Sequence, residues 1–458
     1  MKNVKLFGTK EFYKAAILIA IPVMAQSLIQ SLVSLIDSFM VAGLGDVKMS
    51  GVNISGQILY AFMVIQNAIC AAGGIFLTQF SGAKDKKGMQ QAVAFKSCIT
   101  MIFLILYLVV TVIVPRQILS LMVIGNSQAP EILDQGTMYM SLMGFVGLQS
   151  IISTVIATSY REIGKVKAPL VITVIATIVN TFLNWLLIYG NLGMPRLEVR
   201  GAAYATIVAR TVEVLLFIGY AIYDKPEFIS FEAFKKLDFD LFKKIFEKGW
   251  MVIVSQILWV GSESVASAVY NSRGGADVVS GMSSCFSIMN LILISFAGIN
   301  TATAVLIGKS LGANRLSEAK EEKRWMLSAA VAFGLTMSLI GFGTKLLVPI
   351  VYGNLSIESQ NICKGMINMV SILIPLWIYI NTQLSVLKAG GDTKACMWVD
   401  GVVAVCTVFF LLILAKYTGL GPVAMYIVVK TLDIVKITIG HIQLKRERWV
   451  VSLSAVNR

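Results

Sequence analysis

The segment LTQFSGAKD at residues 77–85 returns in altered form as IGKSLGANR at residues 307–315. Two further motifs recur in the same order. REIGKVK at residues 161–167 returns as KAGGDTK at residues 388–394, and RTVE at residues 210–213 returns as KTLD at residues 430–433. The offsets of 230, 227 and 220 residues drift only by short gaps. The chain therefore consists of two divergent copies of one unit.

The composition indicates a membrane protein. Hydrophobic residues make up 57% of the chain and charged residues only 14%, against about 25% charged residues in soluble proteins. Mean hydropathy is +0.78, and several charge-free runs reach the roughly 20 residues that a spanning helix needs. We predict an all-α integral membrane protein. Its twelve transmembrane helices are expected near 15–42, 52–80, 93–115, 136–160, 168–190, 199–223, 249–272, 279–308, 325–349, 365–388, 396–416 and 419–441.

The repeat predicts how these helices are grouped. Six spans per half is an even number, so both halves enter the membrane in the same orientation and form parallel repeats, an arrangement typical of transporters. The predicted N-terminal six-helix bundle is 1–223 and the C-terminal bundle is 249–444. A cytoplasmic linker, 224–248, rich in Phe and Lys, is expected to form short amphipathic helices on the inner leaflet. A cytoplasmic tail, 445–458, follows the last span.

The net charge of +14 reflects membrane topology. Most of the 39 Lys and Arg residues fall in the linker, in the tail and at helix ends on one side of the predicted membrane. Cytoplasmic loops carry such an excess of positive charge. We therefore predict a multi-pass protein of a bacterial inner membrane, in contact with lipid, with both termini cytoplasmic and no nucleic-acid partner.

The same sequence argues against an enzyme or a channel. A membrane-embedded enzyme needs a nucleophile–base pair or a metal cluster within its spans. The chain has a single histidine, His441, and its acidic residues are widely spaced, so we predict neither catalytic residues nor a bound transition metal. No carbonyl-lined glycine repeat resembling an ion-channel filter occurs in the sequence.

Ionisable residues within spans are costly and are functional candidates by default. Some of them occur in both halves. Arg210 and Glu213 are three residues apart, as are Lys430 and Asp433. This spacing places opposite charges on one face of a helix. We interpret both pairs as structural devices that neutralise charge within the membrane.

Asp37 differs because no cation lies three or four residues from it. It lies six residues before Gly43, about 9 Å from the end of its helix at 1.5 Å per residue. Three polar residues of other spans are expected at a similar depth: Asn180, Asn184 and Thr206. One carboxylate, two amides and a hydroxyl form an oxygen-rich set suited to Na⁺ or to a proton on Asp37. Hydrogen bonding between helices is the simpler alternative for the asparagines.

The second half offers one comparable acid. The position corresponding to Asp37 falls near 262–264, where Glu263 lies one residue out of register. We consider Glu263 a possible substrate-binding acid of the second half.

These residues together resemble the multidrug and toxic compound extrusion (MATE) family. The resemblance covers nearly the whole chain and depends on the order of several short motifs. In the first half these are Ile21-Pro22, Asp37 followed by GLG at residues 43–45, Gln79-x-x-Gly82-Ala83, Arg161-x-x-Gly164-x-x-Lys167, Asn180, and Gly201 to Thr206. In the second half they are GKSLGA at residues 308–313 and KAGGDTK at residues 388–394.

The resemblance implies a V-shaped pair of six-helix bundles that exports organic cations and drugs in exchange for Na⁺ or H⁺. It also implies that Asp37, Asn180 and Thr206 lie at the coupling site, with Na⁺ possible at Asp37 and Asn180. Many members have an acidic residue where this chain has Asn184, so the sequence favours H⁺ slightly. A buried carboxylate without a cation prefers its neutral form. It can therefore exchange a proton, a metal ion or a cationic drug, and we predict that Asp37 is this exchange carboxylate.

One alternative belongs to the same superfamily, a flippase for a lipid-linked oligosaccharide. A flippase for an anionic lipid should line its cavity with several cations, whereas Arg210 and Lys430 each have an acid nearby. We therefore predict export of small organic cations or amphipathic drugs. No organic cofactor is expected, only H⁺ or Na⁺ as coupling ion. Two halves already build a complete cavity, which favours a monomer.

Overall fold

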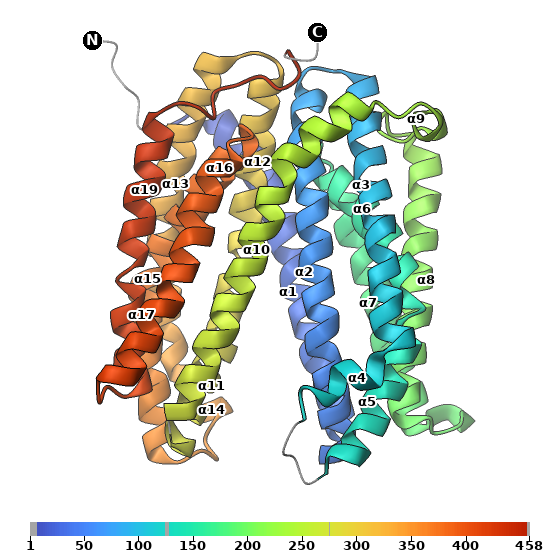
Figure 1. The fold of residues 1–458 in the computed structure, drawn as a ribbon, viewed down its shortest axis with the longest axis vertical. Helices are drawn as coiled ribbons and strands as arrows, with labels where there is room; N and C mark the ends of the chain where they lie inside the picture. The colour runs from blue at the N-terminus through green and yellow to red at the C-terminus, as the bar shows by residue number, and fades with distance from the viewer. Residues whose placement is uncertain (1–6, 124–127, 274, 456–458) are drawn as a thin grey trace. The chain divides into compact units, whose positions relative to one another are not determined.

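The computed structural model describes residues 7–123, 128–273 and 275–455, and within these ranges it consists of helices and turns without a strand (Figure 1). The chain forms two compact units. The N-terminal unit comprises Ala25–Leu77 and Lys86–Ile245, and the C-terminal unit comprises Met1–Met24, Thr78–Asp85 and Phe246–Arg458. The predicted bundle boundaries, 1–223 and 249–444, stay a prediction. Residues 1–6 and 456–458 of the predicted first bundle and tail lie outside the described residues.

Two long helices, α1 (Lys10–Ala42) and α2 (Asp46–Gly82), contribute to both units. The N-terminal unit is completed by shorter elements. Within it, α7 packs along α8, α3 packs against α6, and α5 packs against α8. Their bounds are α3 (Lys86–Leu108), η1 (Val109–Ile113), α4 (Pro115–Ser120), α5 (Ala129–Met143), α6 (Val146–Glu162), α7 (Lys167–Tyr189), η2 (Asn191–Gly193), α8 (Glu198–Asp224) and α9 (Phe231–Lys235).

The C-terminal unit is organised around α15 (Ile357–Ala389), which packs against α11, α12, α13 and α19. The apolar stretch of α15 is 61% buried, more than that of any of the other nine long apolar helices in the described residues. The other elements are α10 (Phe239–Arg273), α11 (Ala276–Leu293), α12 (Phe296–Gly312), α13 (Leu316–Gly343), η3 (Thr344–Leu347), α14 (Val348–Val351), α16 (Thr393–Cys396), η4 (Met397–Val402), α17 (Val403–Tyr417), α18 (Pro422–Lys430) and α19 (Asp433–Lys445). Because α10 begins at Phe239, the second part of the predicted linker is already helix.

Ten described helices are long and apolar enough to cross a membrane, and the bent pair α5–α6 makes eleven. The bend of 51° falls between Met143 and Val146. Tyr107 stabilises it, since its hydroxyl donates a 2.6 Å hydrogen bond to the Met143 carbonyl that the bend exposes. The predicted all-α membrane fold is confirmed.

The twelfth predicted span is helical but broken. It corresponds to α18 and α19, and a turn at Thr431 and Leu432 separates them. The Thr431 hydroxyl donates to the Val428 carbonyl at 2.6 Å, and such side-chain bonds compete with the backbone ladder of a helix. The predicted span is therefore present as two consecutive helical pieces.

The repeated motifs prove to be turns that end helices. In LTQFSGAKD the Asp85 amide donates to the Phe80 carbonyl at 2.9 Å, and in IGKSLGANR the Arg315 amide donates to Ser310 at the same distance. The residues before them, Lys84 and Asn314, both have positive φ, 57° and 58°. Gly164 and Gly391 take the same left-handed place in the second pair of motifs. A left-handed residue closed by such a bond terminates a helix, so the repeat preserves the points where helices stop.

Two glycines of these motifs form a reciprocal contact between α2 and α12. A Cβ at Gly82 would overlap the backbone of Lys309, and a Cβ at Gly312 would overlap the backbone of Gln79. Gln79 and Lys309 occupy matching places in the two motifs, so the crossing has the symmetry of the repeat.

The C-terminal tail packs against this crossing. The buried Gln79 side chain donates to the Ala389 carbonyl and accepts from the Leu453 amide, both at 2.7 Å. The Ser454 hydroxyl donates to the Gly312 carbonyl at 2.9 Å, and Trp449 is fully buried. The described part of the tail is therefore an ordered element of the C-terminal unit.

Replacing Gly312 with alanine tests the crossing. The added methyl group has no room, and overpacking of this kind costs about 1–3 kcal/mol. Gly312→Ala should lower the midpoint temperature of unfolding of the purified protein. Gly343→Ala, at a position where a Cβ meets nothing within 4 Å, is the matched control and should unfold like wild type. Equal midpoints for both variants would contradict the contact.

Candidate functional site

The predicted polar layer forms within the N-terminal unit. Asp37 of α1 accepts a hydrogen bond from the Asn184 Nδ2 of α7 at 2.7 Å. The same amide lies 3.4 Å from the Asn180 Oδ1, one turn earlier on α7, because residues four apart share a helical face. Asn184 is only 3% exposed, and its own Oδ1 is buried without a hydrogen-bond partner. The structure thus brings Asp37 and both asparagines together.

A cavity of about 510 Å³ opens beside this layer. Asp37, Asn180 and Thr206 line it together with serine and glutamine side chains of α1. The Thr206 hydroxyl donates to the Ala202 carbonyl of its own helix at 3.0 Å, which leaves its oxygen able to accept a second partner. The wall of the cavity therefore includes several oxygen atoms, among them the Asp37 carboxylate beside its amide partner.

The first repeated charge pair faces the same cavity. Arg210 donates to the Glu213 Oε2 at 2.7 Å across one turn of α8. Both residues line the cavity beside Asp37. The three-residue spacing on α8 predicts that Arg210 and Glu213 pair, and the 2.7 Å contact agrees with this prediction. Their closeness to Asp37 could not be read from that spacing, because it depends on how α1 and α8 are placed.

A second, more apolar cavity of about 240 Å³ adjoins the first. Four residues line both: Tyr60, Met63, Thr206 and Arg210. The remaining wall is largely aromatic and aliphatic and includes Phe62, Phe103, Tyr107 and Met143. Apolar and aromatic walls with a few polar groups are typical of sites for organic ligands.

The second repeated charge pair does not form. The turn at Thr431 and Leu432 interrupts the helix between Lys430 and Asp433, and each finds another partner. Lys430 lies 3.5 Å from the Glu263 Oε1, and Asp433 accepts a 2.8 Å hydrogen bond from the Trp377 Nε1. The prediction of a Lys430–Asp433 pair is corrected accordingly, and Glu263 takes the place of the expected acid.

Sequence reasoning missed a buried ion pair in the N-terminal unit. Lys96 of α3 is fully buried and forms an ion pair with Glu162 at the end of α6. The hydroxyls of Thr158 and Ser159 lie 3.4 and 3.3 Å from its Nζ. Gly74 of α2 leaves room for the carboxylate, since a Cβ there would overlap it. A lysine within an apolar stretch was the available signal, but its partner is 66 residues away.

Removing the Lys96 ammonium should strongly destabilise the protein, because breaking a buried pair costs about 3–5 kcal/mol. Lys96→Met should therefore give much less folded protein by fluorescence-detected size exclusion, whereas Lys87→Met on the exposed face of α3 should not. Adding Glu162→Gln to Lys96→Met removes the stranded carboxylate and should restore part of the loss. A Lys96→Met protein as stable as wild type would refute the pair's structural role.

No group of three or more His, Cys, Asp or Glu residues that could hold a metal ion occurs within the described ranges. The candidate site is the cavity at Asp37, whose oxygen atoms suit a proton or a hard monovalent cation.

The family model described as MatE matches residues 22–186 and 252–413, more than half of the chain. The chain belongs to the MatE family. The resemblance to the MATE family that the ordered motifs indicate is thus confirmed. The two matched segments lie in the two halves of the repeat. Membership identifies a multi-pass membrane transporter, as predicted, rather than an enzyme.

Relatives and solved structures agree with this assignment. The chain is 25% identical over 347 residues to the "Probable multidrug resistance protein NorM" of Thermotoga maritima, covering 72% of this chain and 70% of that protein. It is 22% identical over 424 residues to the NorM protein of Pasteurella multocida, covering 88% and 87%. A crystal structure of MATE in the straight conformation has a TM-score of 0.84 at 19% identity, covering 98% of both chains. An outward-facing MATE family transporter has a TM-score of 0.81 at 20% identity, covering 97% and 98%.

Proposed function

We propose that this MatE-family chain exports cationic or amphipathic drugs in exchange for H⁺ or Na⁺, with Asp37 as the exchange carboxylate. The observation that carries the proposal is the position of Asp37 on the wall of a 510 Å³ cavity, with an asparagine amide as its hydrogen-bond partner. The relatives named multidrug resistance proteins support the substrate class.

The two adjoining cavities provide the drug site in this proposal. The apolar cavity offers ring faces and methionine side chains, which suit flat or greasy molecules of varied shape. The cavity beside it offers the Asp37 carboxylate to a positive charge. Thr206 and Arg210 line both, so one amphipathic cation can place its rings in the first and its charge in the second.

The side chain of Asn184 allows the same carboxylate to be charged, protonated or metal-bound. In the structure its Nδ2 donates to Asp37, which suits a negative carboxylate, while its Oδ1 is buried and unpartnered. Rotation of the amide by half a turn would turn Oδ1 toward Asp37. This oxygen could then accept a hydrogen bond from protonated Asp37 or help to hold Na⁺ together with Asn180 and Thr206.

Exchange follows from competition for one negative charge. A drug cation, a proton and Na⁺ each neutralise Asp37, and each excludes the others. A ligand shifts a conformational equilibrium only by its difference in affinity for the two states, so binding of drug and ion in different states of the transporter is sufficient for antiport. A second carboxylate at position 184 would favour a bound metal ion, but this chain has the neutral amide of Asn184 there. We therefore favour H⁺ as the coupling ion.

The remaining features are consistent with an exporter of the bacterial inner membrane. Tyr13 of α1 contacts Trp325 of α13, and Lys320 pairs with Glu447 of the tail. The start of α1 and the tail therefore lie at one end of the C-terminal unit, where basic residues are abundant. We propose that this end is cytoplasmic and that the protein works as a monomer in lipid.

A flippase for an anionic lipid is less well supported. Its cavity would need cations free to bind phosphate. Arg210, the cation that lines both cavities, already binds Glu213 at 2.7 Å, so its charge is neutralised.

Asp37→Asn should abolish coupled drug efflux, because the amide can bind neither a proton nor a cation by charge. We expect ethidium efflux from cells that express the wild-type protein to follow an imposed pH or Na⁺ gradient. Cells with Asp37→Asn should retain ethidium like cells without the transporter. The gradient that drives wild-type efflux identifies the ion.

Asp134→Asn is the matched control, since Asp134 is exposed and pairs with Arg116 at the surface. It should export like wild type. Unimpaired efflux by Asp37→Asn at normal expression would refute the role of Asp37. Absence of efflux of any cationic dye by folded wild-type protein would refute the drug-export proposal and favour the flippase.

A further inference from the structure

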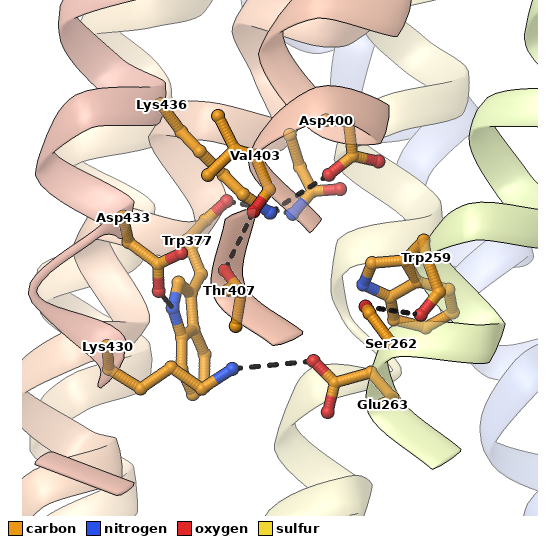
Figure 2. A network of polar contacts seen from close by, with 11 residues as sticks. Trp259, Ser262, Glu263, Trp377, Asp400, Val403, Thr407, Lys430, Asp433 and Lys436 are labelled. Atoms are coloured by element: carbon orange, nitrogen blue, oxygen red, sulfur yellow. Dashed lines mark hydrogen bonds and ion pairs between the residues drawn. The ribbon is translucent and has the colours of Figure 1, made fainter. Parts of the chain in front are cut away.

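The C-terminal unit holds one of its own ammonium groups in an aromatic site. The Lys430 Nζ lies 5.5 Å from the centroid of the Trp377 ring and 5.4 Å from that of Tyr426. Its nearest carboxylate is that of Glu263 on α10, 3.5 Å away. Figure 2 shows Lys430 extending from α18 beside the Trp377 ring and pointing toward Glu263.

Ring faces and a carboxylate are the groups that bind organic cations. An ammonium within about 6 Å of an aromatic centroid is attracted by the negative face of the ring, and quaternary ammonium ligands are held in such aromatic sites. Trp377, Tyr426 and Glu263 supply two ring faces and one negative charge around a single point, and the Lys430 ammonium occupies that point.

The Trp377 ring is fixed for this role by its neighbours. Its Nε1 donates to the Asp433 carboxylate at 2.8 Å, which sets the orientation of the indole. Asp433 is buried, and Lys436 one turn further on is held by Asp400 at 3.0 Å. Figure 2 shows these polar contacts on one side of the indole and the Lys430–Glu263 contact on the other. The Trp377 ring of α15 is therefore held in a fixed orientation.

Lys430 itself is the loosely held member of the set. Its contact with Glu263 is long, 3.5 Å against 2.7 Å for Arg210 and Glu213. The Glu263 side chain is 51% exposed and that of Lys430 is 18% exposed, so the pair is not enclosed by protein. Lysine carries its charge on a flexible four-carbon stem, and Lys430 is the last residue of α18 before the turn. Its ammonium can therefore leave by rotation of its own side chain.

We propose that Trp377, Tyr426 and Glu263 form a second organic-cation site and that Lys430 is a tethered occupant which a substrate ammonium displaces. The inference rests on the proposed function, since it assigns a further site to the same class of substrate. A tethered competitor lowers the affinity of the site for a free cation and returns when that cation leaves, which favours release of the drug.

Lys430→Met tests the proposal. The variant removes the competing ammonium and leaves both ring faces and the Glu263 charge available. Equilibrium dialysis of the purified full-length protein with tetraphenylphosphonium, a cation without hydrogen-bonding groups, should show binding about tenfold tighter than wild type. Lys430→Arg keeps a tethered cation and should show no gain. Adding Glu263→Gln to Lys430→Met should return the affinity to about the wild-type value.

Lys445→Met is the matched control for net charge. It removes the same single positive charge from the same unit, but Lys445 is exposed at the end of α19 and takes no part in the proposed site. A gain confined to Lys430→Met supports the site. An unchanged affinity in Lys430→Met, or an equal gain in Lys445→Met, overturns it. Lys430→Gln, which keeps a polar side chain, carries the same expectation if the Met variant does not fold.

A failure of the second cation site can be distinguished from a failure of the drug-export proposal. Wild-type protein that binds tetraphenylphosphonium and exports ethidium, together with an unchanged Lys430→Met, overturns only the second site. Wild-type protein that exports no dye along any gradient overturns the export proposal, and a gain in Lys430→Met under those conditions would still support the cation site.

Discussion

The cost of placing charge in an apolar membrane is the constraint on which this structure depends. Lys96 pairs with Glu162, Arg210 with Glu213, and Lys436 with Asp400. The first pair joins α3 to α6, the second lies within α8, and the third joins α19 to η4. Asp37 stands apart because its hydrogen-bond partner is the neutral amide of Asn184. Under the proposed function, the carboxylate of Asp37 is neutralised by the exchanged cation or proton.

The two halves share their turns more closely than their chemistry. Lys84 and Asn314 follow the ends of their helices in the same left-handed conformation, and Gly82 and Gly312 each contact the backbone of the facing helix where α2 crosses α12. These features concern backbone geometry, which tolerates little change. The polar sites differ: the N-terminal unit presents Asp37 among amides, whereas the C-terminal unit presents Lys430 among aromatic rings. The two copies therefore share their helix-ending turns and differ in the polar groups that surround Asp37 and Lys430.

Sequence alone predicted the helices and the Asp37 layer because both depend on local patterns. Apolar length identifies spans, and equal distances from helix ends placed Asp37 and Asn184 at one depth. The predictions that failed or were missed concern contacts that local sequence patterns do not specify. The turn at Thr431 and Leu432, where the Thr431 hydroxyl donates to the Val428 carbonyl, separates Lys430 from Asp433. The pairing of Lys96 with Glu162 depends on how α3 packs against α6, and the shared cavity of Asp37 and Arg210 depends on how α1 meets α8.

In the proposed mechanism, drug and coupling ion compete for the single charge of Asp37. This competition can be measured as the affinity of the purified protein for ethidium at a series of pH values and Na⁺ concentrations. We expect one of the two ions to weaken ethidium binding in proportion to its concentration, and Asp37→Asn to bind ethidium weakly and independently of both ions. Ethidium affinity that is insensitive to both ions in the wild type, or equally sensitive in Asp37→Asn, would contradict this mechanism.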